Sequence, residues 1–392
     1  MTQTAHAVEL PSWSVWRAGS LSDLLTIGIE EEFMLLNPRD WSLAYRSRDV
    51  LACLPYDLRA RVTLETHAAV MEIATGVHRT VAGAVDELAG LRRKLACAVA
   101  GRGLRVAVAG THPAALWKDT VVTTHPRYRH IGQSMRVLAR REPTLATHVH
   151  VGVPSPHAAV ELMNRLRAHL PLLLALSANS PFWQGRPTGF ASTRTTLFDA
   201  FPRSGVPRAF SGYADWVATV DRLLRSGAIA DPSFLWWDIR LQPRYGTVEV
   251  RIPDAQTTVE DVAAVAALVH SLARLELERP GEEPPPIELI QENRFLAARD
   301  GMDAHLIDAG GARTPAREQL ARVLADCAPA ARRLGCRREL AQVRDLAANT
   351  GAERQLASAR GMDLRRVATR LADAYEPVQR RVAAPEWLAQ LA

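Results

Sequence analysis

The chain has 392 residues, of which 47% are hydrophobic and 23% are charged, and it carries a formal charge of +6. These proportions are typical of globular proteins and argue against the disordered and membrane classes. The opening residues lack a basic segment followed by an apolar run, and no window reaches ~18 uninterrupted apolar residues. We therefore expect a cytoplasmic protein that does not bind membranes, built as one large domain with an appendage or as two domains.

The basic residues are almost all arginines, with Lys94 and Lys118 as the exceptions. They are spread along the chain rather than gathered in a block or interleaved with aromatic residues, which argues against a nucleic-acid partner. An anionic small substrate fits the positive charge equally well. The four cysteines show no CxxC spacing, which indicates reduced thiols rather than a zinc or redox pair. They are Cys53, Cys97, Cys327 and Cys336.

Short runs of β-branched or alternating apolar residues beside turn residues predict the strands. In chain order they are TIGIEEEFMLL (26–36), VMEIAT (70–75), GLRVAVAG (103–110), THVHVGV (147–153) and GTVEVRI (246–252). Helical periodicity predicts helices over 81–100, 156–180 with a bend at Pro171, 258–279, 287–300, 314–348 and 352–375. The segment RPGEEPPP (279–286) reads as a connector.

This order of elements predicts an α+β fold with a mainly antiparallel sheet and helices packed on one face. Residues 1–279 form the α+β region, and residues 287–392 form a helical C-terminal region on the same domain. The motifs GxxxxGK[ST] and GxGxxG are absent, so a P-loop or a Rossmann nucleotide site is not supported. The motifs HExxH and GxSxG are absent as well.

Three predicted strands carry paired functional side chains on one face, because residues two apart on a strand share a face. The pairs are Glu30 with Glu32, His148 with His150, and Glu249 with Arg251. Each strand has an apolar opposite face, so one interpretation is a half-solvated antiparallel sheet. The alternative is a site where the polar faces converge. Carboxylates that converge raise one another's pKa unless cations intervene, and Mg²⁺ or Mn²⁺ would supply that charge.

A fourth acidic contributor is Glu72, which interrupts the apolar run VMEIAT. Glu65 and His67, in the preceding LETH, compete with it for the same role.

Three arginines beside glycine, proline or aromatic residues complement the acidic set. They are Arg194, Arg240 and Arg251. A guanidinium group pairs bidentately with phosphates or carboxylates and stays charged at any working pH. Each of them alone is equally explained as a structural salt bridge.

Five motifs in a fixed order carry a resemblance to a known family. They are GIEEEF, MEIAT, THVHVGV, WWDIRLQPRYGTVEVRIPDAQT and ENRFLAARDGMDAHLID. From about residue 24 to about residue 375, the chain resembles the carboxylate-amine ligase family related to glutamate-cysteine ligase, called glutamate-cysteine ligase type 2. The resemblance implies a curved, glutamine synthetase-like antiparallel sheet that carries the active site. It also implies ATP-dependent amide formation through an acyl phosphate, with two or three Mg²⁺ ions.

The resemblance also implies roles for particular residues. The metal ligands would be Glu30, Glu32, Glu72, His148 and Glu249. The ATP-binding residues would be Arg194, Arg240, Arg251 and His150, and the catalytic residues Arg251, Glu249 and Arg240. The implied partners are amino acid and amine substrates, and family members commonly self-associate, so homo-oligomerisation is a further expectation.

The identity of the substrates stays open at this point. Glutamate is the expected donor by resemblance, and the acceptor is cysteine, another amino acid or another amine. One alternative function is a kinase-like enzyme that phosphorylates a carboxylate or a guanidino group without ligation. Another is a non-catalytic sensor, whose mark would be loss of the acidic set. That set is complete, because Glu30, Glu32, Glu72 and Glu249 are all present.

Overall fold

A seven-stranded antiparallel sheet forms the centre of the protein. The computed structural model describes residues 10–17, 25–141, 143–279, 284–359, 361 and 363–375. The strand order is β10 (Ile239–Gln242), β11 (Thr247–Val250), β5 (Thr147–Gly152), β1 (Ile27–Leu36), β3 (Val70–Ala74) and β2 (Val62–Leu64). β4 (Arg105–Ala107) pairs with the C-terminal part of β1. The predicted α+β class with a mainly antiparallel sheet is confirmed.

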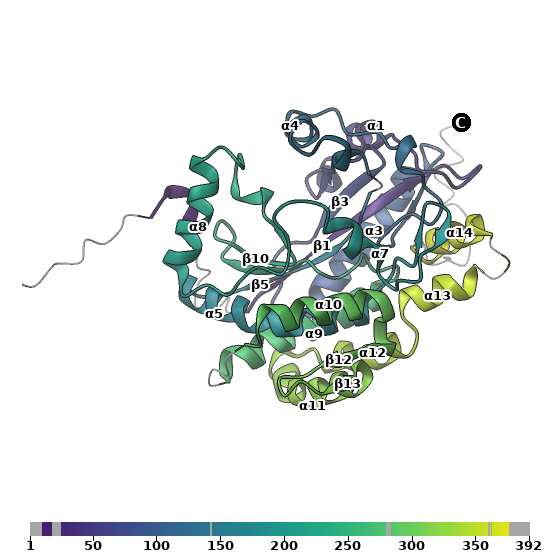
Figure 1. Cartoon of the computed structure of the whole chain (residues 1–392). Helices are drawn as coiled ribbons and strands as arrows, with labels where there is room; N and C mark the ends of the chain where they lie inside the picture. The colour runs from purple at the N-terminus through teal and green to yellow at the C-terminus, as the bar shows by residue number, and fades with distance from the viewer. Residues whose placement is uncertain are drawn as a thin grey trace, which may run out of the picture.

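Helices cover the apolar face of this sheet (Figure 1). α3 (Val81–Ala100) contacts β1, α9 (Val259–Glu278) contacts β5, and α5 (Pro156–Leu166) contacts β10 and β11. The strand residues that point towards them are apolar, as alternation requires: Ile27, Ile29 and Phe33 of β1 are all buried. Burial of this face against the helices forms the main core.

The C-terminal helices pack on the helical layer and on one edge of the sheet. α10 (Ile287–Asp300) lies against α6 (Leu170–Ser177), while α11 (Ala316–Leu334) and α12 (Arg337–Ala348) pack on α9. α13 (Gly351–Ser358) contacts α14 (Leu364–Tyr375), which lies against β4. In Figure 1 these segments are green to yellow, beside and below the sheet.

The remaining elements are short. The helices are α1 (Ser47–Cys53), α2 (Tyr56–Arg59), α4 (Pro126–Met135), α7 (Thr193–Phe198) and α8 (Tyr213–Arg225). Three small two-stranded pairs are β6 (Phe182–Trp183) with β7 (Arg186–Pro187), β8 (Ser204–Gly205) with β9 (Trp236–Trp237), and β12 (His305–Ile307) with β13 (Arg313–Pro315).

Three of the predicted helices are each divided in the structure. The segment predicted as 156–180 is α5, a 3₁₀ turn (Arg167–His169) and α6, so the break precedes Pro171, which lies in the first turn of α6. The segment 314–348 divides at Gly335, which ends α11 with φ +69°. The segment 352–375 is α13 and α14. Periodic apolar spacing continues across such breaks, because both halves present the same kind of face to the core.

Other differences concern strands and linkers. The predicted strand 103–110 shortens to β4, and β2 and β10 were not predicted. β11 ends at Val250, so Arg251 follows the strand instead of lying in it. The connector predicted over 279–286 falls partly on residues 280–283, which lie outside the described residues.

One charged residue of β1 points into the helical layer. Glu31 has no exposed surface, and its carboxylate accepts hydrogen bonds from the Nε and Nη2 of Arg92, in α3. Arg92 also donates to the carbonyl oxygens of Gln256 and Thr257, each at 2.9 Å. The three consecutive glutamates of β1 therefore serve two different faces, and the middle one is part of the core.

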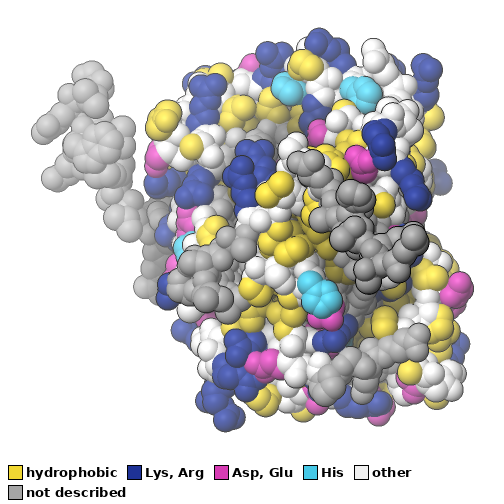
Figure 2. Space-filling model, turned by 90° about the vertical axis from the view of Figure 1, so that its left-hand side faces the viewer, with side chains coloured by type: hydrophobic (Ala, Val, Ile, Leu, Met, Phe, Trp, Pro, Cys, Tyr) yellow, Lys and Arg dark blue, Asp and Glu magenta, His cyan; other side chains and the backbone are white. Residues whose placement is uncertain are grey.

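The surface and the cysteines agree with a globular protein. All four cysteines are free. On the face shown in Figure 2, lysine and arginine side chains are dispersed among other residues instead of forming one block. No helix within the described residues has both the length and the hydropathy needed to cross a membrane.

Candidate active site

The strand register lines up acidic and imidazole side chains in a row across the open face of the sheet. Side chains of directly opposed residues in an antiparallel pair lie on the same face. The opposed pairs are Glu72 with Glu32, His148 with Glu30, His150 with Glu249, and Glu249 with Arg240. The strand register therefore brings the polar strand faces together, which the sequence alone left open.

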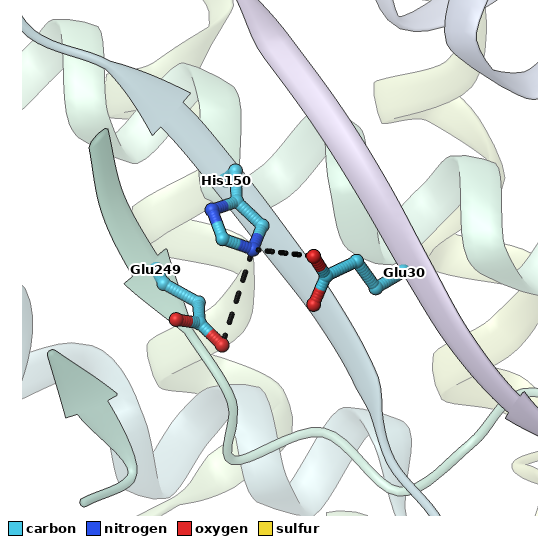
Figure 3. Close-up of side chains that lie close together, drawn as sticks. All are labelled: Glu30, His150 and Glu249. Carbon is cyan, nitrogen blue, oxygen red and sulfur yellow. Dashed lines mark ion pairs between the residues drawn. The ribbon is translucent and has the colours of Figure 1, made fainter. Parts of the chain in front are cut away.

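The two histidines of β5 lie between the carboxylates. The Nδ1 of His148 is 3.3 Å from a carboxylate oxygen of Glu30 and 3.7 Å from one of Glu72. The Nε2 of His150 is 3.3 Å from Glu30 and 3.9 Å from Glu249 (Figure 3). Although it is close to both carboxylates, the buried Nε2 of His150 has no hydrogen-bond partner in acceptable geometry.

These side chains form three groups of potential metal ligands. They are Glu30, His150 and Glu249; Glu30, Glu72 and His148; and Glu32, Glu65 and Glu72. Within each group the ligand atoms lie within 4.8 Å of one another. Glu30 belongs to the first two groups and Glu72 to the last two, so the three positions adjoin. Carboxylate-rich sets of this kind fit Mg²⁺ or Mn²⁺, and the unpaired Nε2 of His150 between two carboxylates fits a cation at the first position.

The electrostatics differ along the row. Burial, reinforced by Glu30, Glu65 and Glu32, raises the pKa of Glu72 well above its usual range. Burial and the charge of Glu32 raise the pKa of Glu65 to about 8. Protein neighbours at this end of the row therefore do not balance the negative charge that Glu65 and Glu72 carry when both are ionised.

At the other end the charges are balanced. Burial would raise the pKa of Glu249, but Arg240 and Arg251 hold it well below its usual range. Burial also opposes ionisation of Glu30, but His150 and His148 lower its pKa below the usual value. The pKa of His148 is lowered to about 4, mainly by burial and by Arg251.

Glu249 is the centre of a hydrogen-bonded cluster and has no exposed surface. Its carboxylate accepts from the Nε of Arg240 at 2.6 Å, from the Nη2 of Arg240 at 3.1 Å and from the side-chain Nε2 of Gln242 at 2.7 Å. Arg251 also donates to it. Arg240 in turn donates to the carbonyl oxygen of Leu235 at 3.0 Å, so its guanidinium is fixed.

Arg194, predicted to bind the nucleotide, lies behind this cluster. It is 6% exposed and donates to the carbonyl oxygens of Ile252 at 3.0 Å and Arg251 at 3.2 Å. Arg194 does not line either of the two cavities at the site, which are described below. Its contacts indicate a role in holding the backbone at Arg251.

Two cavities meet at the row of acidic residues. The larger, about 820 Å³, contains Glu32, Glu65, Glu72, His148, Arg240 and Arg251 in its wall. The smaller, about 710 Å³, is lined by Gly28, His150 and Thr247 among others. Glu30, Arg17 and Tyr245 line both cavities. Glu30 therefore lies where a molecule in one cavity would meet a molecule in the other, and Glu32, Glu65 and Glu72 lie on the side of the larger cavity.

The larger cavity also contains residues that sequence reasoning did not single out. Arg127 of α4 lies 3.3 Å from Asp231, and Tyr128 lines the same wall. Phe201 and Trp236 form an aromatic wall with ring centroids 5.9 Å apart. Helix α4, the loop at Phe201 and the two-residue strand β9 carry no strand alternation, so only the tertiary structure places them here.

Comparison with known proteins identifies the family. Residues 26–370 match the model of glutamate-cysteine ligase family 2. Two proteins of Rubrobacter xylanophilus, named as predicted glutamate-cysteine ligases 2-1 and 2-3, are 39% and 40% identical to this chain. The alignments cover 84% and 89% of this chain and 89% and 96% of those proteins.

The chain belongs to glutamate-cysteine ligase family 2. The resemblance read from the sequence motifs is thereby confirmed. The protein is an ATP-dependent carbon-nitrogen ligase of a family that acts on small amino acid substrates.

Solved structures support the fold of this family member. The glutamate-cysteine ligase of Francisella tularensis, solved in complex with AMP, superposes with a TM-score of 0.68 at 13% identity, over 94% of this chain and 91% of that one. The bifunctional glutathione synthetase of Pasteurella multocida gives a TM-score of 0.67 at 12% identity, over 92% of this chain and 54% of that one. At these identities the likeness concerns the fold.

Proposed function

We propose that the protein joins a carboxylate donor, with glutamate the first candidate, to an amine through an acyl-phosphate intermediate. The observation that carries the proposal is the set of adjoining ligand groups at the junction of two cavities. ATP would occupy one cavity, the amino acid and amine the other, and the reacting atoms would meet over the carboxylates. Cysteine is one candidate acceptor among several.

Mg²⁺ or Mn²⁺ would be held by Glu30, Glu32, Glu72, His148 and Glu249, with His150 and Glu65 completing the groups. The bound ions would neutralise the carboxylates and the nucleotide phosphates, which is the main requirement of phosphoryl transfer. The raised pKa of Glu72, whose ionised form its protein neighbours do not balance, supports this assignment, because a bound cation would supply the missing positive charge.

The chain's own residues supply position and charge. A donor carboxylate oxygen attacks the γ-phosphorus of ATP, the bond to the bridging oxygen breaks, and ADP leaves. The amine nitrogen then attacks the acyl carbon, the bond to the phosphoryl oxygen breaks, and the phosphate leaves with the proton lost by the amine. Arg251, in the wall of the larger cavity, binds the transferring phosphoryl group. Arg240 fixes Glu249, and no protein nucleophile is required.

The kinase-like alternative shares the first step and lacks the second. The aromatic wall and the size of the larger cavity favour ligation, since they leave room for an amine beside the donor. The two-region division at residues 279–287, self-association and a cytoplasmic location stay predictions.

The test is ADP release by the purified protein with MgATP and glutamate, with the twenty amino acids and simple amines as acceptors and mass spectrometry of the products. A product mass equal to glutamate plus amine minus water is expected. A phosphorylated product without an amide would favour the kinase-like reaction. Absence of both ADP release and Mg²⁺-dependent ATP binding would refute the assignment of the acidic row.

A further inference from the structure

The backbone at Arg251 is held from two sides. The amide groups of Arg251 and Ile252 donate to the carbonyl oxygen of Asp238, at 2.8 and 3.1 Å. The carbonyl oxygens of the same two residues accept from Arg194. Asp238 lies between β9 and β10, and Arg194 belongs to α7, so two separate elements determine where Arg251 stands.

One residue of the C-terminal region joins these two elements. Arg294 of α10 donates from Nε to Asp238 at 2.6 Å. Its Nη1 and Nη2 donate to the two carboxylate oxygens of Asp199, at 2.7 and 2.8 Å. Asp199 is the C-cap of α7, the helix that carries Arg194. The guanidinium of Arg294 is therefore shared between the end of α7 and the segment that supports Arg251.

Burial makes this arrangement sensitive to change. Arg294 is 8% exposed and Asp238 is 6% exposed. Removal of a buried charge leaves its partner unpaired, and the structure relaxes to rehydrate or re-pair it. Asp238 carries both the carboxylate that pairs with Arg294 and the carbonyl oxygen that accepts the two amide bonds, so a backbone shift that rehydrates or re-pairs this carboxylate displaces Arg251.

We infer that Arg294 is a positioning residue for Arg251, and that through it the C-terminal helical region sets the geometry of the active site. The inference rests on the proposed function in one respect only, the assignment of Arg251 to the transferring phosphoryl group. The structural half, that loss of Arg294 displaces Arg251, stands without it.

The experiment compares Arg294→Gln and Arg294→Lys with Arg299→Gln. Arg299 is on the same helix and makes the same kind of two-bond pair, with Asp300, but its side chain is 42% exposed. Asp199→Asn is a further variant, because the Asp199 side chain is 43% exposed and its loss should leave folding intact. Measurements are kcat, the KM for ATP and for the acceptor, and a crystal structure of each variant.

We expect Arg294→Gln to lower kcat on the order of 10- to 100-fold, because small misplacements of a group that acts in the transition state have effects of this size. The KM for ATP should change far less, because a group that acts mainly in the transition state contributes little to binding of the substrate itself. Arg294→Lys should lower kcat less than Gln does, because lysine can pair with one of the two carboxylates. Arg299→Gln should match the wild type.

The outcomes separate this inference from the proposed function. Wild-type kcat in both Arg294→Lys and Asp199→Asn would overturn it, and these variants decide if Arg294→Gln does not fold. If the wild type shows no ligase activity, the crystal structures decide. The inference then survives only if Arg251 leaves its place beside Glu249 in an Arg294 variant and keeps it in Arg299→Gln.

Discussion

Replacement of Glu31 by glutamine should destabilise the protein without affecting its chemistry. Glu31 and Arg92 are 0% and 2% exposed, so Arg92 would lose its only carboxylate partner among the hydrogen bonds described for it. Breaking a buried pair by removing one partner costs about 3–5 kcal/mol. The lower end, ~3 kcal/mol, applies because the bonds from Arg92 to the carbonyl oxygens of Gln256 and Thr257 remain.

The assay is equilibrium urea unfolding without metal or nucleotide, together with a thermal melt. A loss of ~3 kcal/mol is a large part of a total of about 5–15 kcal/mol, and in a chain of this length it lowers Tm by roughly 4 °C. ADP release is measured well below Tm, where Glu31→Gln is folded, and should equal that of the wild type.

The matched control is Glu32→Gln, one residue further along the same strand. Glu32 points to the cavity, and burial raises its pKa, so a neutral side chain there should leave Tm nearly unchanged. ADP release should be lost, because a ligand of the third metal group is removed. The reasoning is wrong if Glu31→Gln keeps its Tm and loses activity, since the two faces of β1 would then be assigned the wrong way round.

Three other predictions concern the acidic row and one tight contact. Glu72→Gln should leave the Tm of the metal-free protein unchanged or raised at pH 8, because a carboxyl group with a raised pKa in the folded state makes the folded protein less stable as pH rises. The same variant should weaken Mg²⁺-dependent ATP binding by more than about tenfold, as measured by titration calorimetry. Mg²⁺ binding should release protons from Glu72 and Glu65, and its affinity should increase between about pH 6.5 and 8.5. Calorimetry in buffers of different ionisation enthalpy measures the number of protons released. The same apparent affinity throughout this range would contradict the raised pKa values. Gly351→Ala should lower Tm, because its Cβ would collide with the side chain of Asn179. Gly132→Ala, with open space around the Cβ, should be neutral or stabilising. Equal melting temperatures for the two variants would refute the close contact at Gly351.

The local part of this protein was readable from the sequence. Alternation placed Glu30 and Glu32 on one face of a strand and Glu31 on the other, and the structure has them so. The histidines of THVHVGV and the carboxylate of Glu72 also lie on the predicted face. Side-chain direction along a strand depends only on the backbone's two-residue repeat, so the sequence suffices for it.

What the sequence left open depended on contacts between distant segments. Helical periodicity places Arg92 on the apolar face of α3, between Leu88 and Leu95, but no local pattern identifies Glu31, 61 residues earlier, as its partner. The sequence suggested that Arg194 binds a ligand. Only its hydrogen bonds to two backbone carbonyl oxygens indicate that it holds the backbone at Arg251.

Strand order and helix packing decided the rest. Which strands are neighbours determines whether two carboxylates lie together or apart, and the divisions within the predicted helices depend on how each half packs. These contacts join residues that are far apart in the sequence, so no local repeat determines the distance between them. Burial and charge balance depend on all the segments that meet in the folded protein. Local periodicity thus set the faces of the elements, and tertiary packing set which of those faces meet.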